Sequence, residues 1–172
     1  MKTVWSIEID APRERVWRAL TAPGEIQPFY YGSRFEGDLR PGGAFRYATP
    51  DGSRTFIRGT VVEVLPNERF VHTFRFTDLA EPEQRVSVEL EDVARGTRVT
   101  IRHEGLDAAP KHRRRVAGGW ARILGNLKAW VEQGSLPASA RLQNLVMKAF
   151  LPLLPAEVPA AADAAERRTG DR

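Results

Sequence analysis

Residues Thr97 to Val131 read TRVTIRHEGLDAAPKHRRRVAGGWARILGNLKAWV, and this stretch decides the fold. Its first seven residues alternate between polar and apolar side chains, which predicts a strand buried on one face. A turn at Glu104 and Gly105 and a short basic loop follow, and a long helix then begins near Gly118. Apolar residues recur along this helix at steps of three and four: Val116, Trp120, Ile123, Leu124, Leu127, Trp130 and Val131. One whole face of the helix is therefore apolar and must pack against another layer of the protein.

Size and composition favour one domain of ordinary globular type. The chain has 172 residues, of which 42% are hydrophobic and 28% charged, and this suits a single packed core with an appendage. No window approaches the ~20 apolar residues that cross a bilayer, and the amino terminus enters a strand pattern without an apolar signal segment. Cysteine is absent, which excludes disulfides, thiol nucleophiles and thiolate metal sites. We therefore expect a cytoplasmic protein that does not act at a membrane.

Upstream of the long helix, the sequence supplies one strand, two short helices and then a series of strands. Residues 3–10 alternate as a strand, Ala11 and Pro12 begin a helix, and residues 25–29 are expected to add a second short helix. Turn residues then separate six strands, at 33–38, 44–48, 54–64, 69–76, 84–91 and 97–103. Gly59 is the expected bulge or bend in the third of these. Because the connections are of hairpin length, neighbouring strands should pair antiparallel, which gives an α+β architecture.

Alternation within the strands assigns one face of the sheet to the long helix. The residues expected to line the space between sheet and helix are Tyr31, Phe45, Tyr47, Phe56, Arg58, His72, Phe74, Phe76, Val88, Leu90, Trp120, Leu124 and Leu127. Periodicity alone does not distinguish a filled core from a hollow cavity there.

Polar residues at inward positions are the more informative members, because burial without a partner costs free energy. His72 could bind a ligand or a buried backbone group. Arg58 could pair with a ligand carboxylate, although a bulge at Gly59 would turn it to solvent. His103, at a strand end, is expected to make a structural hydrogen bond.

The sequence changes character after Gly134. Residues 1–134 form the predicted core domain, and residues 135–154 are expected to be a linker and an amphipathic helix, with apolar side chains at helical spacing from 141 onward. This helix could pack on its own domain, cap a cavity or pair with a second chain, so the sequence allows a monomer or a homodimer. Residues 155–172 are rich in alanine, proline and charge and are expected to be disordered.

Five segments, in this order, carry a family resemblance: 9–21 (IDAPRERVWRALT), 37–43 (GDLRPGG), 59–64 (GTVVEV), 100–105 (TIRHEG) and 118–120 (GGW). Over residues 3–134 the chain resembles the SRPBCC superfamily of START-like, helix-grip proteins, in the branch related to the activator of the heat-shock chaperone ATPase. The resemblance implies a βααβ6α helix-grip fold, with a curved seven-stranded antiparallel sheet wrapped around the long helix and a cavity between them. It does not imply one reaction, since this superfamily includes lipid carriers, hormone receptors, cyclases and chaperone regulators.

Residue patterns typical of catalysis or metal binding are sparse. The sequence has no Gly-x-Ser-x-Gly elbow, no glycine-rich phosphate loop, and three histidines without metal-ligand spacing. We therefore predict no catalytic residue, no metal and no cofactor. The basic run from Lys111 to Arg115 has no interleaved aromatic residues, which favours a solvated loop over a nucleic-acid surface.

Three functions remain open at this point. The leading hypothesis is non-catalytic binding of a hydrophobic or amphipathic small molecule in the cavity between sheet and helix. The second is a cofactor-independent enzyme of the cyclase or aromatase type, with His72 as the candidate acid or base. The third is a chaperone-regulating or other protein-interaction module, suggested by the resemblance and by the basic run at residues 111–115.

Overall fold

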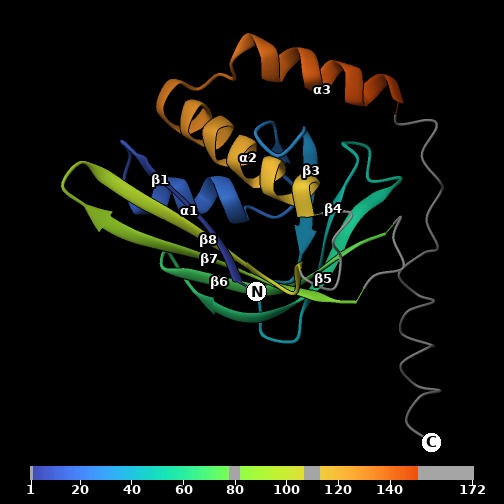
Figure 1. Ribbon diagram of the computed structural model, residues 1–172, viewed down its shortest axis with the longest axis horizontal. Coiled ribbons are helices and arrows are strands. Elements are labelled where there is room, and N and C mark those ends of the chain that lie inside the picture. The colour runs from blue at the N-terminus through green and yellow to red at the C-terminus, as the bar shows by residue number, and fades with distance from the viewer. Residues whose placement is uncertain (1, 78–81, 107–112, 151–172) are drawn as a thin grey trace, which may run out of the picture.

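An eight-stranded antiparallel sheet curls around one long helix in the computed structural model, which describes residues 2–77, 82–106 and 113–150 (Figure 1). The strands are β1 (Lys2–Ile9), β2 (Ile26–Gln27), β3 (Ser33–Gly37), β4 (Ala44–Ala48), β5 (Thr55–Leu65), β6 (Arg69–Phe76), β7 (Gln84–Val93) and β8 (Gly96–Glu104). The helices are α1 (Arg13–Thr21), α2 (Arg113–Gln133) and α3 (Ala138–Phe150). The predicted α+β class is confirmed.

The sheet order is β1-β8-β7-β6-β5-β4-β3-β2, so that only the first strand joins the sheet out of sequence. β1 pairs antiparallel with β8, for example Trp5 with Ile101. The chain then crosses from this edge to the opposite edge through α1 and returns strand by strand. Helix α2 lies across the inner face of the curled sheet (Figure 1).

The second short helix predicted at residues 25–29 is absent, and that prediction was wrong. Ile26 and Gln27 instead form β2, which pairs with β3 and makes the sheet eight-stranded rather than seven-stranded. The backbone N–H of Gly24 donates to the Phe35 carbonyl at 2.7 Å, and this pairing fixes the segment as an extended edge. The Gln27 amide donates to the Leu20 carbonyl at 2.9 Å and so closes the last turn of α1.

The predicted apolar stripe of α2 is buried against the sheet. Val116, Trp120, Ile123, Leu124, Leu127 and Val131 are at most 5% exposed, and Trp130 is half-buried. Burial of such a side chain contributes roughly 1.5–3 kcal/mol relative to exposure. The stripe therefore anchors the helix along its length.

Irregular pairing in β5 curves the sheet, although not at the residue that the sequence indicates. The register shifts after Tyr47 in the β4–β5 pair and after Val61 in the β5–β6 pair, rather than at Gly59. Gly59 is nevertheless required, because a Cβ atom there would overlap the Thr73 carbonyl and the Phe45 ring. The Phe45 ring thus fills the space that a side chain on β5 would occupy.

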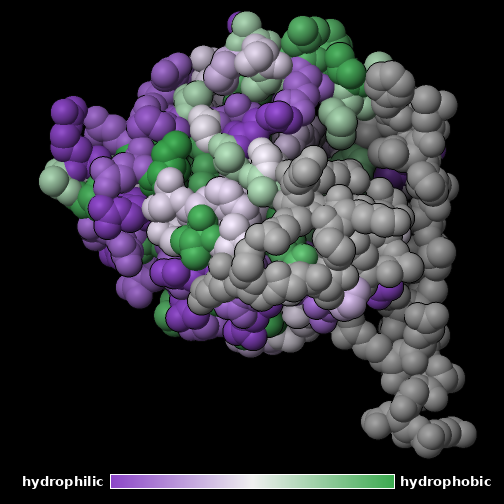
Figure 2. Space-filling model, viewed as in Figure 1, coloured by the Kyte–Doolittle hydropathy of each residue, from purple (hydrophilic) through white to green (hydrophobic). Residues whose placement is uncertain are grey.

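Helix α3 packs against the domain by one side only. Leu136 and Ala140 are buried, and the Asn144 amide donates to the Pro28 carbonyl at 2.9 Å. On the outward side Leu142 and Leu145 are 62% and 64% exposed, and hydrophobic residues gather over α3 in Figure 2. The end of the predicted helix and the tail predicted at 155–172 lie outside the described residues.

Candidate functional site

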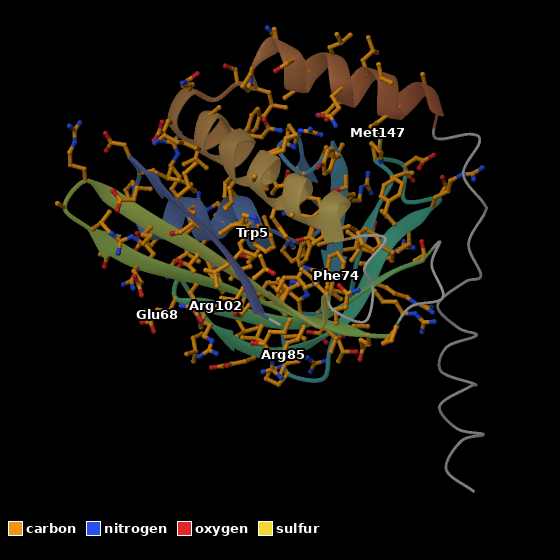
Figure 3. The ribbon with its side chains drawn as sticks, in the orientation of Figure 1. Trp5, Glu68, Phe74, Arg85, Arg102 and Met147 are labelled. Carbon is orange, nitrogen blue, oxygen red and sulfur yellow. The ribbon has the colours of Figure 1, made fainter. Side chains whose placement is uncertain are left out.

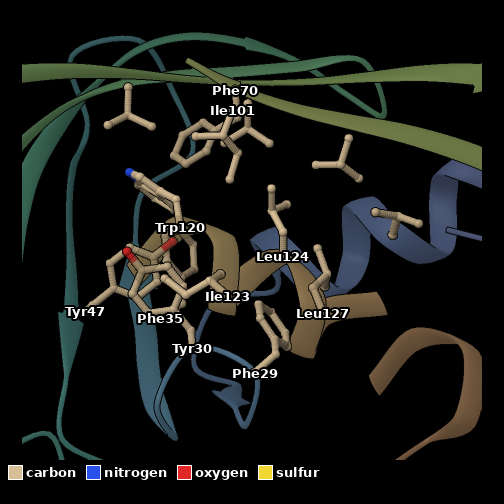
Figure 4. Packing of buried hydrophobic residues seen from close by; sticks show 14 of the residues in the cluster. Phe29, Tyr30, Phe35, Tyr47, Phe70, Ile101, Trp120, Ile123, Leu124 and Leu127 are labelled. Atoms are coloured by element: carbon tan, nitrogen blue, oxygen red, sulfur yellow. The ribbon is translucent and has the colours of Figure 1, made fainter. Parts of the chain in front are cut away.

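The inner face of the sheet and the facing side of α2 enclose a cluster of buried aromatic and aliphatic side chains (Figure 4). Nine of the predicted lining residues are no more than 7% exposed in it: Phe45, Tyr47, His72, Phe74, Val88, Leu90, Trp120, Leu124 and Leu127. Tyr31 and Phe76 are half-buried and pack against the cluster. The predicted set is thus largely gathered in one place.

Arg58 and Phe56 differ from the prediction. The inner position on β5 belongs to Ile57, which pairs with Phe76 and is 6% exposed. Arg58 lies on the outer face, where it pairs with Arg75, and Phe56 is half-buried at the register shift between β4 and β5. From residue 55 to residue 61 the odd-numbered positions point inward, and after the register shift beyond Val61 it is Val64 that packs against the core. One alternation applied to the whole strand therefore gave the wrong face, and the ligand-facing role predicted for Arg58 is wrong.

A pair of tyrosines stacks at one end of the cluster. The Tyr30 and Tyr47 rings lie 4.2 Å apart at an interplanar angle of 2°, and each residue is 6% exposed. Trp120 meets the Tyr30 ring edge-on at 6.0 Å. Neither tyrosine hydroxyl has a hydrogen-bond partner among the described residues. Burial raises the pKa of both phenols, so at neutral pH each remains a neutral hydrogen-bond donor.

The turn before β3 carries Tyr30 and Tyr31 and has a strained backbone at Tyr31. Tyr31 has φ of 57°, in the left-handed region that bulky residues rarely adopt, and Gly32 follows at 69°. The Tyr31 hydroxyl comes within 3.7 Å of the position that a Cβ of Gly119 would take. This distance is an ordinary van der Waals contact, so Tyr31 lies directly beside α2 at this point. Such strain is commonest where function requires it.

His72 is buried among aromatic rings with one nitrogen unused. It is 2% exposed, and the Phe45 and Phe70 rings lie 4.5 Å and 4.8 Å from its ring. Nδ1 lies 2.7 Å from the Thr73 carbonyl oxygen, which can only accept, so Nδ1 carries the proton. Nε2 is then an acceptor, with no partner among the described residues. Burial lowers the pKa of His72 to about 4, and the ring is neutral at pH 7.

His103 uses both of its nitrogens. The Trp120 indole N–H donates to Nδ1 at 2.9 Å, so Nε2 carries the proton and donates to the Gln84 Oε1 at 2.6 Å. Burial, and then the nearby His72, lower the pKa of His103 to about 4. These two hydrogen bonds connect α2 to β8 and β7, which confirms the structural role expected for His103.

Several members of the cluster were missed by the sequence reasoning. Phe35, in the short strand β3, and Gln84, the first residue of β7, both occupy inward positions, so the alternation of these strands could have identified them. Phe29 lies in a turn, where no periodicity indicates burial.

A second candidate region is a shallow depression of about 440 Å³ on another part of the surface. It is lined by Arg13, Leu65, Glu68, Arg69, Glu89, Leu90, Glu91 and Asp92. Six of these eight side chains are charged, which does not suit a hydrophobic ligand. Within the described ranges, no three His, Asp or Glu side chains gather as a metal site, and no helix is long and apolar enough to cross a membrane.

The fold and its buried aromatic interior define an α+β protein of the helix-grip class. Residues 10–132 match the family described as Activator of Hsp90 ATPase homolog 1-like protein. The match spans well over half of the chain, and the protein belongs to this family. No curated protein matches the chain.

Solved structures with the same fold come from diverse sources. PFC0360w, an HSP90 activator from Plasmodium falciparum, is 26% identical, with a TM-score of 0.62 over 75% of this chain and 94% of its own. CalU16 from Micromonospora echinospora is 21% identical, with a TM-score of 0.63 over 84% and 82% of the two chains. DynU16, a protein in the dynemicin biosynthetic locus, is 22% identical with a TM-score of 0.66; the match covers 78% of this chain and 48% of DynU16.

Proposed function

We propose that the protein binds a hydrophobic small molecule that carries a hydrogen-bonding hydroxyl group, in the space between the sheet and α2. The observation that carries the proposal is the unused Nε2 of His72, a neutral acceptor in a residue 2% exposed and surrounded by aromatic rings. A ligand that covered Nε2 without donating to it would lose about 1–3 kcal/mol. A ligand hydroxyl that donates to Nε2 would avoid this loss.

The stacked tyrosines supply the complementary polar groups. The Tyr30 and Tyr47 hydroxyls are neutral donors without partners among the described residues, and they lie in the same aromatic cluster as His72. Aromatic walls with a few polar groups are the usual composition of small-molecule sites. CalU16 and DynU16 share the fold, and DynU16 belongs to a biosynthetic locus, which is consistent with a small-molecule role.

Three related probes test the proposal: 1-naphthol, which has a hydroxyl donor, 1-methoxynaphthalene, which lacks it, and naphthalene. We expect 1-naphthol to bind about tenfold more tightly than the other two, since one buried hydrogen bond contributes about 1–1.5 kcal/mol. Fluorescence titration and thermal shift would measure this. Equal binding of all three probes, or no binding by any, would contradict the proposal.

Matched variants locate the site. Tyr47→Phe removes a hydroxyl that has no partner among the described residues, so it should leave the melting temperature unchanged and weaken only ligands that accept a hydrogen bond. His72→Phe should abolish the preference for 1-naphthol. Phe76→Leu, at the margin of the cluster, is the control and should leave that preference intact.

Catalysis by His72 is a weaker candidate for a physical reason. A general base that works at neutral pH needs a pKa near 7, whereas burial lowers the pKa of His72 to about 4. Proton abstraction by this ring would therefore be slow, and binding is favoured over a cyclase-type reaction. Turnover of a carbonyl substrate that is lost in His72→Gln at constant melting temperature would reverse this preference.

A protein-partner function is the second candidate. It is favoured by the family match and by the likeness to PFC0360w, an HSP90 activator. The test is the ATPase rate of purified Hsp90 with and without this chain. Stimulation that saturates with concentration would support the candidate, and an unchanged rate would remove it.

A further inference from the structure

The outer face of the sheet, turned away from α2, carries arginines in two different settings. Figure 3 shows Phe74 between the sheet and α2, with Arg85 and Arg102 on the opposite side of the sheet. Toward β1 and β8 the arginines are neutralised: Arg98 contacts a Glu8 carboxylate oxygen at 2.7 Å, and Arg102 contacts Glu89 at 3.0 Å. This part of the face is a balanced charge network.

Two exposed arginines on β6 and β7, beside Arg58 on β5, form the other setting. Arg58 lies directly opposite Arg75, and Arg85 lies opposite Thr73 and so diagonal to Arg75. We call Arg75 and Arg85 the arginine cluster; Arg58 is their neighbour and has an interaction of its own. Arg75 and Arg85 are exposed and form no salt bridge to a carboxylate of the described residues. On β8 the residue opposite Arg85 is Glu104, and no salt bridge joins these two residues, so the guanidinium groups of Arg75 and Arg85 remain available to an anion.

We propose that the arginine cluster binds an acidic, extended segment of a partner protein. Guanidinium groups match carboxylates in charge and in bidentate geometry. Diagonal neighbours on a sheet stand about 7–8 Å apart, and alternate side chains of an extended chain stand about 7 Å apart on one side. Carboxylates at every second residue of a partner segment would therefore meet successive arginines of the cluster.

The surroundings favour a protein segment over a nucleic acid. Single-stranded nucleic acids bind through aromatic side chains on which the bases stack, as well as through positive charge. Within residues 2–77, 82–106 and 113–150, none of the exposed large hydrophobic side chains is aromatic. The cluster offers charge without a stacking platform. The proposal concerns the outer face and is independent of a ligand in the interior.

The test uses the full chain and a fluorescein-labelled ten-residue peptide that alternates glutamate and serine. Arg75→Gln combined with Arg85→Gln should weaken peptide binding about fivefold to tenfold in 50 mM NaCl. The matched control combines Arg95→Gln with Arg98→Gln, which removes the same charge from residues paired with Asp10 and Glu8. The control should change affinity less than twofold. Fluorescence anisotropy measures both, with a ten-residue oligothymidylate as the comparison ligand.

Each alternative result has a defined meaning. Equal weakening by the two double variants would show that only net charge matters and would overturn the proposal. An unchanged affinity in the Arg75 and Arg85 variant would overturn it as well. Tighter binding of oligothymidylate than of peptide, lost in the same variant, would identify a nucleic-acid surface instead. Melting temperatures serve as the folding control, and both double variants should melt within a few degrees of the wild type, since surface substitutions usually change stability little.

Discussion

Replacement of Trp120 by phenylalanine tests whether the hydrogen-bonded chain through His103 holds α2 on the sheet. The substitution keeps an aromatic ring in the cluster but removes the indole N–H, which donates to His103 Nδ1 at 2.9 Å. His103 cannot compensate by changing its tautomer. With the proton on Nδ1, its Nε2 would lose the role of donor to Gln84, so one buried polar atom stays unsatisfied in either form.

The expected cost combines two terms. Trp120 and His103 are 5% and 0% exposed, so the lost donor leaves a fully buried acceptor, at about 1–3 kcal/mol. The smaller ring buries less apolar surface, at roughly 1 kcal/mol. The total is about 2–4 kcal/mol, which corresponds to a fall in Tm of roughly 5–15 °C for a protein of this size.

Urea unfolding at pH 7, with Trp130→Phe as the control, measures this effect. Trp130 lies on the same helix and is half-buried, with no side-chain hydrogen bond among the described residues, so its replacement should cost about 1 kcal/mol or less. The double variant Trp120→Phe with His103→Leu completes a mutant cycle. If the two tryptophan variants lose equal stability, or the cycle gives a coupling energy of zero, the hydrogen bond contributes nothing and the reasoning fails.

Three further predictions concern single positions. The pKa of His72 in the folded state, about 4, lies below its ordinary value of 6.5. Its neutral form therefore stabilises the fold fully above pH 6.5 and less as the pH falls toward 4. Between pH 7.0 and pH 4.5, the unfolding free energy in urea should fall less for His72→Phe than for the wild type. Gly59→Ala should lower stability by more than about 2 kcal/mol, because the new methyl group overlaps the Thr73 carbonyl. Gly125→Ala, in open space on α2, should instead stabilise the fold by up to about 1 kcal/mol. Similar melting temperatures for the two variants would refute the overlap. Leu145→Ser should change stability by no more than about 0.5 kcal/mol, since the side chain is 64% exposed, and a large loss would mean that another surface covers it in solution.

Periodicity predicted the elements that repeat over several turns or residue pairs. The α2 stripe was correct because an apolar face at helical spacing has only one way to be buried against a sheet. Strand β6 was equally predictable, since Phe70, His72 and Phe74 occupy every second position and all lie on the inner face. In both cases the local pattern and the tertiary packing favour the same structure.

Short and irregular segments were not predictable in the same way. Residues 25–29 have no strand pattern of their own, and β2 exists because the β3 backbone offers partners to Gly24 and Glu25. A register shift in β5 likewise depends on how two neighbouring strands fit, and it puts Ile57 on the inner face before the shift and Val64 on it afterwards, which leaves Arg58 on the outer face. The turn at Tyr30 and Tyr31 is set by contacts with α2 and β4 that no local pattern encodes.

Two inward histidines of one sheet therefore acquire different roles from their partners alone. His72 and His103 have the same ordinary pKa, similar burial and the same direction of shift. His103 has a donor on one nitrogen and an acceptor on the other, so a ligand could reach it only by breaking the contacts that hold α2. His72 has one nitrogen bound to its own strand, and the other is available without any loss of fold contacts. This difference makes His72, rather than His103, the first residue at which to test the proposed ligand binding.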